Sequence, residues 1–414
     1  MNRITILLTA LLALPLSANA QWYLFPLTEE EEKTAQTTKP EEKTVSTPAQ
    51  TPAAQAQEAV IEETPAAETE EEDIYTMDKA DVINVSLILP MNLGGKASAN
   101  FIEMYSGALL AARDLGEQGL DINLSVYDSD SEESLITEDV LKSSDVIIGP
   151  VSTDALLTNI SKAPKKRFVS PLEPKAAALV DSSYVIQAPS QSNAQVDELI
   201  QWLINESVAG DDIILVKDSV QSAIGEQTAY LLSKLGTSGL RYKTTYLPSS
   251  ITPSSIGNTR YVIASERDSY IATAVRQIGI SSMKRKKSDL YIYGTSRVRN
   301  AKGVELQYLY RANARITMNY AVDYSDPKTR EFILAYRALF KDEPASFAFQ
   351  GYDVMNYFTK ICAKYGRKWY KKLPEYSERG LQSNFKFVET EAKGNINTAV
   401  RKVCFNPDSS ITVQ

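Results

Sequence analysis

The side chains best placed for ligand chemistry are the small hydroxyls Ser152 and Thr153. They follow the apolar run Val146–Ile148 and the pair Gly149-Pro150. The run fits a strand buried on both faces of a parallel sheet, and Pro150 ends it because proline has no N–H to donate. Ligands of open parallel sheets bind beyond the carboxyl ends of the strands, which favours Ser152 and Thr153 as ligand contacts. The alternative is that one of them only caps the following helix.

Several catalytic and metal-binding chemistries are excluded or disfavoured by residue types. The chain has no histidine, which removes His-based triads and His metal sites. Asp128–Glu132 begins like a calcium loop but lacks its glycine and distant glutamate, so a turn is predicted. Gly94–Ala97 lacks the spacing of a phosphate loop, and Ser281–Lys284 has the Ser-x-x-Lys spacing without its companion motifs. We therefore expect neither enzyme activity nor a metal or cofactor.

The N-terminus predicts export. Met1–Ala20 combines Arg3, an apolar run and a small-x-small ending, which is typical of a secretory signal cleaved before Gln21. No cysteine follows the cut, so a lipid anchor is not indicated, and no later stretch predicts a transmembrane segment. We expect a soluble periplasmic protein of a Gram-negative type envelope. An uncleaved signal that acts as an anchor is the alternative.

Residues 21–81 are predicted to be a disordered acidic linker. The tract from Thr28 to Ala80 contains 15 acidic residues, 4 basic residues and no glycine. The remainder, 81–414, is nearly neutral at about +2, so the acidic pI says nothing of its binding surface, and we expect no nucleic-acid partner. The aromatic cluster Trp22–Leu27 precedes this tract. It is either a remnant beside the cleavage site or a short docking peptide.

The chain from residue 82 onwards is long enough for two lobes. The first series of predicted elements comprises strands Val82–Leu89, Ile122–Tyr127, Val146–Ile148 and Arg167–Val169, a helix starting at Asn100 and a helix around Ser134–Leu141. Asn100 and Glu103 form a capping-box pattern, and the helix that they open has one apolar face. Strands and helices in alternation indicate an α/β doubly wound lobe.

A second series of similar size follows. It comprises helices Ala194–Asn205, Gly225–Leu235 and Ser269–Ile278, and strands Ile213–Val216, Tyr242–Tyr246, Tyr261–Ala264 and Leu290–Tyr293. Gly236 fits a helix stop. The remaining elements must be shared between the lobes: strand Arg315–Tyr320, helices Pro327–Phe340 and Gly351–Tyr365, and an alternating stretch from Asn384. The predicted fold class is two similar doubly wound parallel-sheet lobes.

Six short motifs occur in the order typical of one known family. They are the strand Val85–Pro90 with its glycine loop, Tyr105–Ala112, Val126–Ser129, Ile147–Pro150, Val169–Pro171 and Ser346–Asp353. In this combination the chain from Val82 to its C-terminus resembles the type I periplasmic solute-binding proteins, the group that includes leucine/isoleucine/valine-binding proteins. It looks closest to Bacteroidetes envelope proteins in which this domain follows peptidoglycan-binding modules.

The resemblance implies two lobes joined by three crossovers, with a cleft that closes on a ligand by hinge motion. We expect the crossovers near Pro189–Ser192, Ala312–Ile316 and Ser383–Phe385. Lobe 1 would then comprise 82–188 and 316–384, and lobe 2 would comprise 189–315 and 385–414. The cysteines Cys362 and Cys404 would lie on different lobes, where a disulfide would obstruct closure, so we expect two buried free thiols and keep a disulfide as the alternative.

In amino-acid-binding members of the family, loops of the first lobe hold the ligand carboxylate and an acidic residue of the second lobe binds the ammonium. The resemblance suggests these ligand-binding candidates: Asn92, Ser152, Thr153, Ser170, Glu266 and Ser296. The chain departs from the family at Leu172 and Pro174, where small or hydroxyl residues are usual. The loop Gly294–Arg297 lacks the acidic residue. Glu266 either replaces it or is a solvated loop residue, so the ligand need not be an amino acid.

Two functions follow from these observations. The first is a non-enzymatic periplasmic binding protein that closes on a small solute and passes it to a membrane transporter or sensor. The alternative is an envelope interaction protein that keeps the fold as a scaffold, for example an activator or organiser of cell-wall synthesis with a cell-wall partner. The basic run Arg285–Lys287 is expected to be a solvated face, with contact to anionic envelope polymers as its alternative.

Overall fold

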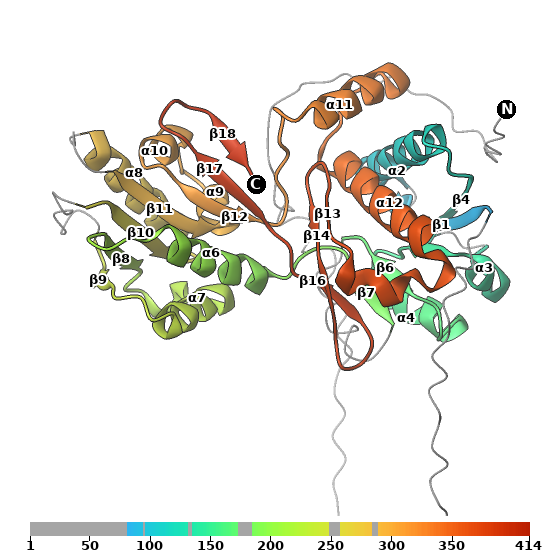
Figure 1. Ribbon diagram of the computed structural model, residues 1–414, viewed down its shortest axis with the longest axis horizontal. Helices are drawn as coiled ribbons and strands as arrows, with labels where there is room; N and C mark the ends of the chain where they lie inside the picture. Colours follow the sequence, from blue (N-terminus) through green and yellow to red (C-terminus); the bar gives the residue numbers. More distant parts are fainter. Residues whose placement is uncertain (1–80, 94–95, 131–134, 173–183, 248–256, 284–288) are drawn as a thin grey trace, which may run out of the picture. The chain divides into compact units, whose positions relative to one another are not determined.

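The computed structural model describes residues 81–93, 96–130, 135–172, 184–247, 257–283 and 289–414. The predicted signal, the acidic tract with Trp22–Leu27 and the run Arg285–Lys287 lie outside these residues. The described part of the chain forms two α/β lobes, each built around a seven-stranded sheet (Figure 1). The predicted fold class is confirmed.

Lobe 1 is built on a sheet with the strand order β15-β16-β7-β6-β5-β1-β4. Its strands are β1 (Ile83–Leu89), β4 (Ile122–Asp128), β5 (Val146–Ile148), β6 (Phe168–Ser170), β7 (Val185–Gln187), β15 (Phe387–Glu389) and β16 (Asn395–Asn397). Six of them run parallel, and β15 pairs antiparallel with β16. The apolar runs are short and buried because helices cover both faces of a parallel sheet.

The helices of lobe 1 form two layers. Against one face lie α2 (Ala99–Glu117), α12 (Ser346–Tyr365) and η4 (Gly366–Glu375), and against the other lie α3 (Glu138–Ser143) and α4 (Thr153–Lys162). A further helix, α11 (Pro327–Phe340), packs through Phe332 and Tyr336 on α2 and α12. Two short hairpins, β2 (Asn92–Leu93) with β3 (Lys96–Ala97) and β13 (Glu378–Arg379) with β14 (Asn384–Phe385), complete the lobe.

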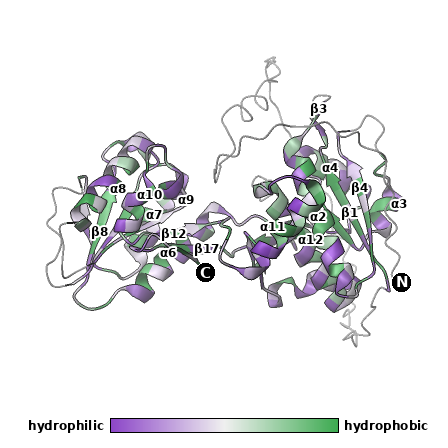
Figure 2. Cartoon of the chain, turned by 90° about the horizontal axis from the view of Figure 1, so that it is seen from above, coloured by the Kyte–Doolittle hydropathy of each residue, from purple (hydrophilic) through white to green (hydrophobic). Residues whose placement is uncertain are grey.

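Lobe 2 repeats this plan with the strand order β18-β17-β12-β11-β10-β8-β9. Its strands are β8 (Asp212–Lys217), β9 (Lys243–Thr245), β10 (Thr259–Ala264), β11 (Leu290–Thr295), β12 (Arg315–Met318), β17 (Arg401–Phe405) and β18 (Ile411–Val413). The helices are α6 (Ser192–Glu206), η2 (Gln221–Ala223), α7 (Glu226–Thr237), α8 (Asp268–Met283), α9 (Ser296–Asn300) and α10 (Leu306–Arg311). In Figure 2 the strands β1 and β8 are mostly hydrophobic, while the helices carry residues of both kinds.

Three crossovers join the lobes, but two of them lie elsewhere than expected. The first, between β7 and α6, matches the prediction near Pro189–Ser192. The second follows β12, because this strand pairs with β11 in lobe 2 and does not open lobe 1. The third follows β16, because β16 pairs with β7 and keeps residues up to Asn397 in lobe 1. The sequence pattern marked these strands but could not show which sheet each one joins.

The three crossovers contact one another. Asn319 on the second donates from Nδ2 to the carbonyl oxygen of Ser190 on the first, at 2.9 Å. The Ser190 hydroxyl donates in turn to the carbonyl oxygen of Ala399 on the third. These few hydrogen bonds connect the segments that would have to flex if the lobes moved.

Other local expectations were wrong. Helix α2 begins one residue before Asn100, its N-cap is Ser98, and no side-chain hydrogen bond caps it. Gly236 lies inside α7, which continues to Thr237.

Cys362 and Cys404 are both buried free thiols, as expected. Among the residues that the structure describes, no helix combines the length and the apolar character needed to cross a bilayer.

Candidate functional site

The predicted ligand residues of lobe 1 lie at the carboxyl edge of its sheet. The strands β6, β5 and β1 are neighbours, and Leu87 pairs with Ile148, which pairs with Val169. Ser170 ends β6, the pair Ser152 and Thr153 follows β5, and Asn92 follows β1. The parallel topology therefore brings segments far apart in the sequence to one edge.

Two of these side chains already have structural roles. Ser152 is exposed, and its Oγ accepts a hydrogen bond from the backbone N–H of Ala155 at 3.3 Å. Ser152 thus caps α4, as the alternative interpretation held, while its O–H remains able to donate. Asn92 is exposed as well and donates from Nδ2 to Oδ2 of Asp128 at 2.8 Å. Asp128 also accepts from the backbone N–H of Met91 at 3.0 Å and thereby fixes the turn after β1.

The other two hydroxyls of this edge are buried. Thr153 Oγ1 and Ser170 Oγ have no hydrogen-bond partner within the described part of the chain. Buried polar atoms are normally paired, so each such hydroxyl has unused hydrogen-bonding capacity. Both lie next to the strand ends where ligands bind in open parallel sheets.

In lobe 2 the predicted residues Glu266 and Ser296 also lie at a carboxyl edge, after the neighbouring strands β10 and β11. Glu266 is not simply a solvated loop residue. Its Oε1 accepts from the backbone N–H of Thr228 in the first turn of α7 at 3.4 Å. A Cβ on the N-cap residue Gly225 would lie 2.0 Å from Oε2, so the carboxylate occupies the space that a side chain there would need. Glu266 therefore stabilises the positive end of α7.

Ser296 is the first residue of α9, and a hydrogen bond from its backbone N–H fixes its position. Its N–H donates to Oε1 of Gln195 on α6 at 2.9 Å. The preceding residue, Thr295, donates from Oγ1 to Oε1 of Gln227 on α7 at 3.1 Å. Two buried or half-buried amide side chains thus fix the loop after β11.

The sequence interpretation missed an ionic cluster at the same edge of lobe 2. Asp218 follows β8 and is almost completely buried. Its carboxylate accepts from Nη2 and Nε of Arg267, at 2.9 and 3.0 Å, and from Oγ of Ser265 at 2.8 Å. Burial by itself raises the pKa of Asp218, but the bonds from Val220 N–H, Ser265 and Arg267 outweigh it and leave the pKa below its usual value. The rule that selected Ser152, a polar residue just after a buried strand, also selects Asp218.

A second guanidinium group adjoins this cluster. Arg297 pairs with Oδ1 of Asp268 at 2.7 Å and donates to the carbonyl oxygen of Glu266. The edge of lobe 2 thus carries three carboxylates, each with a partner, and two guanidinium groups. Such an edge can hydrogen-bond a polar solute. Over the described ranges, no cluster of three or more Cys, Asp or Glu side chains could hold a metal ion.

Comparisons with known proteins agree with this architecture. No family model matches the sequence, and no curated protein matches it significantly. Among solved structures, a putative branched-chain amino acid ABC transporter from Rhodospirillum rubrum matches with a TM-score of 0.53 and 13% identity, over 80% of this chain and 100% of that chain. An ABC transporter substrate-binding protein from Desulfitobacterium hafniense in complex with Leu matches with a TM-score of 0.45 and 14% identity, over 80% of this chain and 100% of that chain.

The first of these similarities exceeds the TM-score at which two chains share a topology, whereas its identity of 13% is too low to indicate a ligand. Its coverage, 80% of this chain, is long enough to include both seven-stranded sheets. The described part of this chain therefore has the two-lobed α/β fold of the type I periplasmic binding proteins.

Proposed function

We propose that this chain is a non-enzymatic, exported solute-binding protein whose two lobes close on a small molecule in the periplasm. The observation that carries the proposal is the placement of the candidate ligand residues at the carboxyl edges of both sheets. Asn92, Ser152, Thr153 and Ser170 lie on lobe 1, and Glu266 and Ser296 lie on lobe 2. The three linked crossovers would serve as the hinge. A membrane transporter or sensor would receive the solute.

The charges of the two edges favour a solute with a carboxylate and without an ammonium group. In lobe 2, Asp218, Glu266 and Asp268 are already paired with Arg267, α7 and Arg297. An ammonium group would have to compete with these partners. In lobe 1, the O–H group of Ser152 can donate to a ligand and lies at the start of α4. This helix has 10 residues, and its N-terminal end favours negative charge.

A thermal-shift screen with small carboxylic acids tests this proposal. The panel contains pairs of compounds with and without an α-ammonium group. A ligand at 100 times its Kd adds about 2.7 kcal/mol to the free energy of unfolding, which raises Tm clearly. We expect at least one carboxylic acid without an ammonium group to give this rise. If no compound does so and native mass spectrometry recovers a protein partner, the scaffold alternative holds instead.

The variant Ser152→Asp tests the lobe 1 contact. Aspartate retains the N-cap of α4, so the stability of the free protein should change little, while its charge repels a carboxylate. We expect affinity to fall roughly tenfold or more. Ser161→Asp places the same charge at the other end of α4 and serves as the control. Unchanged affinity in Ser152→Asp would show that the carboxylate does not bind at this edge.

A further inference from the structure

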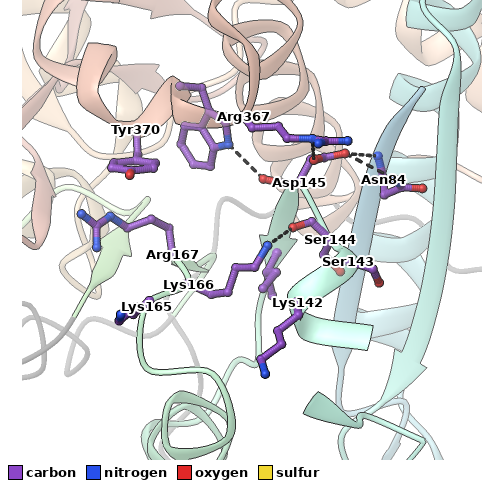
Figure 3. Close-up of a pocket in the computed structure, with 12 residues that line it drawn as sticks. Asn84, Lys142, Ser143, Ser144, Asp145, Lys165, Lys166, Arg167, Arg367 and Tyr370 are labelled. Atoms are coloured by element: carbon purple, nitrogen blue, oxygen red, sulfur yellow. Dashed lines mark hydrogen bonds and ion pairs between the residues drawn. The ribbon is translucent and has the colours of Figure 1, made fainter. Parts of the chain in front are cut away.

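A basic pocket lies at the opposite edge of the lobe 1 sheet, where the strands begin. Asn84 is the second residue of β1, Asp145 immediately precedes β5, and Arg167 immediately precedes β6. Arg367 and Tyr370 of η4 close the other side (Figure 3), and Trp369 of the same element also lines the pocket. The cavity has a volume of about 550 Å³, which is within the range of small-molecule sites. The solute-binding function proposed above does not involve this edge.

Positive charge prevails in this pocket. Five cationic side chains line it, against a single carboxylate: Lys142, Lys165, Lys166, Arg167 and Arg367 against Asp145. The carboxylate is already neutralised, because Asp145 accepts from Nε of Arg367 at 3.2 Å and from the backbone N–H of Asn84 at 2.9 Å. Lys142 pairs with Glu138 one helical turn away. Within the part of the chain that the structure describes, Lys165, Lys166 and Arg167 form no ion pair.

Neutral groups contact Lys166 and Arg167 and hold them in place. Lys166 donates from Nζ to the carbonyl oxygen of Ser144 at 2.8 Å, a neutral acceptor. The Arg167 guanidinium lies over the rings of Tyr184 and Tyr370, 3.8 and 4.3 Å from their centroids. Stacking uses the flat faces of the guanidinium and not its N–H groups, which can therefore still donate to an oxyanion.

Burial of these two cationic groups lowers the pKa of each. Burial lowers the pKa of the Lys166 ammonium, and the charge of Asp145 only partly offsets it. Burial lowers the pKa of Arg167 in the same way, and its Nε is buried without a hydrogen-bond partner among the described residues. The charge of Glu389 on β15 also acts on Arg167, but the two side chains form no ion pair in the described part of the chain. A site that keeps desolvated positive charge is prepared for an anion.

We propose that this pocket binds a phosphate group, which contacts Lys165 and Arg167, while the ammonium of Lys166 adds positive charge nearby. A phosphate monoester carries close to two negative charges and three acceptor oxygens, which suits the surplus of cationic groups in this pocket better than the single charge of a carboxylate does. The phosphate belongs either to a soluble phosphorylated compound or to the headgroup of a phospholipid.

Two binding measurements on the mature protein distinguish these sources. Isothermal titration with inorganic pyrophosphate detects a site for soluble phosphates. Co-sedimentation with vesicles of phosphatidylglycerol, compared with phosphatidylcholine, detects a headgroup site. We expect binding in one of the two assays. Binding in neither would overturn the proposal.

Charge reversal locates the site. Lys165→Glu changes an exposed side chain, so folding should be unaffected, and we expect affinity for the responding probe to fall roughly tenfold or more. Lys302→Glu makes the same change on the exposed surface of lobe 2 and should leave affinity within about twofold. Equal losses in both variants would mean that only net charge matters and would overturn the proposed site. Arg167→Lys keeps the charge but removes the planar guanidinium that stacks on the two tyrosine rings, so it should weaken binding as well.

Discussion

A Cβ atom on Gly351 would lie 2.0 Å from the carbonyl oxygen of Met104. The two residues are far apart in the sequence, on α12 and α2, and these helices lie side by side in lobe 1 (Figure 1). The contact is reciprocal, because a Cβ on Gly107 of α2 would lie 1.9 Å from the carbonyl oxygen of Ala348 of α12. The two helices can approach this closely only because each has a glycine at the crossing.

Gly351→Ala should therefore destabilise lobe 1 strongly. The added methyl group meets a backbone oxygen that cannot move without shifting a whole helix, so we expect a loss of about 2–4 kcal/mol in the free energy of unfolding. Urea unfolding followed by circular dichroism measures it. Gly236→Ala is the control, because Gly236 also lies in a helix but has no neighbour within 4 Å of the added methyl group. It should stabilise α7 by about 0.5 kcal/mol. Similar losses in both variants would contradict the close packing.

Glu103 on α2 should make stability depend on pH. Burial, with a smaller effect of Asp342, raises the pKa of Glu103 from 4.5 to about 7, and its Oε2 is buried without a partner among the residues described. Between these pH values the folded protein holds a proton that the unfolded chain releases. This contribution to stability is therefore present below pH 4.5 and lost as the pH rises to 7.

Glu103→Gln removes the buried charge. We expect the free energy of unfolding of the variant to exceed that of its parent by about 1–2 kcal/mol at pH 8. This difference should vanish near pH 4.5. Urea unfolding at several pH values measures it. Glu117→Gln, at an exposed position of the same helix, should show no such trend. If the difference in stability between the parent and Glu103→Gln does not depend on pH, the raised pKa of Glu103 is refuted.

Asp353 on α12 holds the loop between β13 and β14. Its carboxylate is buried and accepts from the backbone N–H groups of Leu381, Gln382 and Ser383 at 2.6, 2.9 and 2.9 Å. Asp353→Asn replaces one acceptor oxygen by a donor, which leaves buried N–H groups unpaired, so we expect a loss of about 2–4 kcal/mol in stability. Urea unfolding measures it, with Asp408→Asn at an exposed turn as control. A loss no larger than that of the control would show that the loop has other support.

The two cysteines should be unreactive in the folded protein. Burial raises the pKa of the Cys362 thiol to about 12 and raises that of Cys404. The thiolate is the reactive form, so iodoacetamide at pH 8 should modify neither residue until urea is added, and both residues afterwards. Mass spectrometry counts the modifications. A mass that changes on reduction, or modification only after reduction, would instead indicate a disulfide.

The order and type of most elements could be predicted from local patterns. The strand Val146–Ile148 and the helix Pro327–Phe340 have the predicted bounds, because apolar runs and helical periodicity depend on near neighbours in the sequence. Shorter features were missed or misplaced. Gly236 resembles a helix stop but lies within α7, because packing of Leu231 and Leu235 in the core continues the helix to Thr237.

The candidate site could be predicted in position but not in detail. A polar residue after a buried strand lies at the carboxyl edge whatever its partners are, which placed Ser152, Ser170 and Glu266. What these side chains do there depends on groups distant in the sequence. Glu266 caps α7 through Thr228, and Asp218 is paired with Arg267.

By itself the sequence determined that the chain folds as repeated βα units with polar strand ends, because hydrophobic periodicity is a local property. Only the tertiary structure decided that β15 and β16 extend the sheet of lobe 1, and that β12 belongs to lobe 2. It also brought the starts of β5 and β6 next to η4 and so formed the basic pocket. Strand pairing and the convergence of charges depend on contacts between residues far apart in the chain, and no local pattern encodes them.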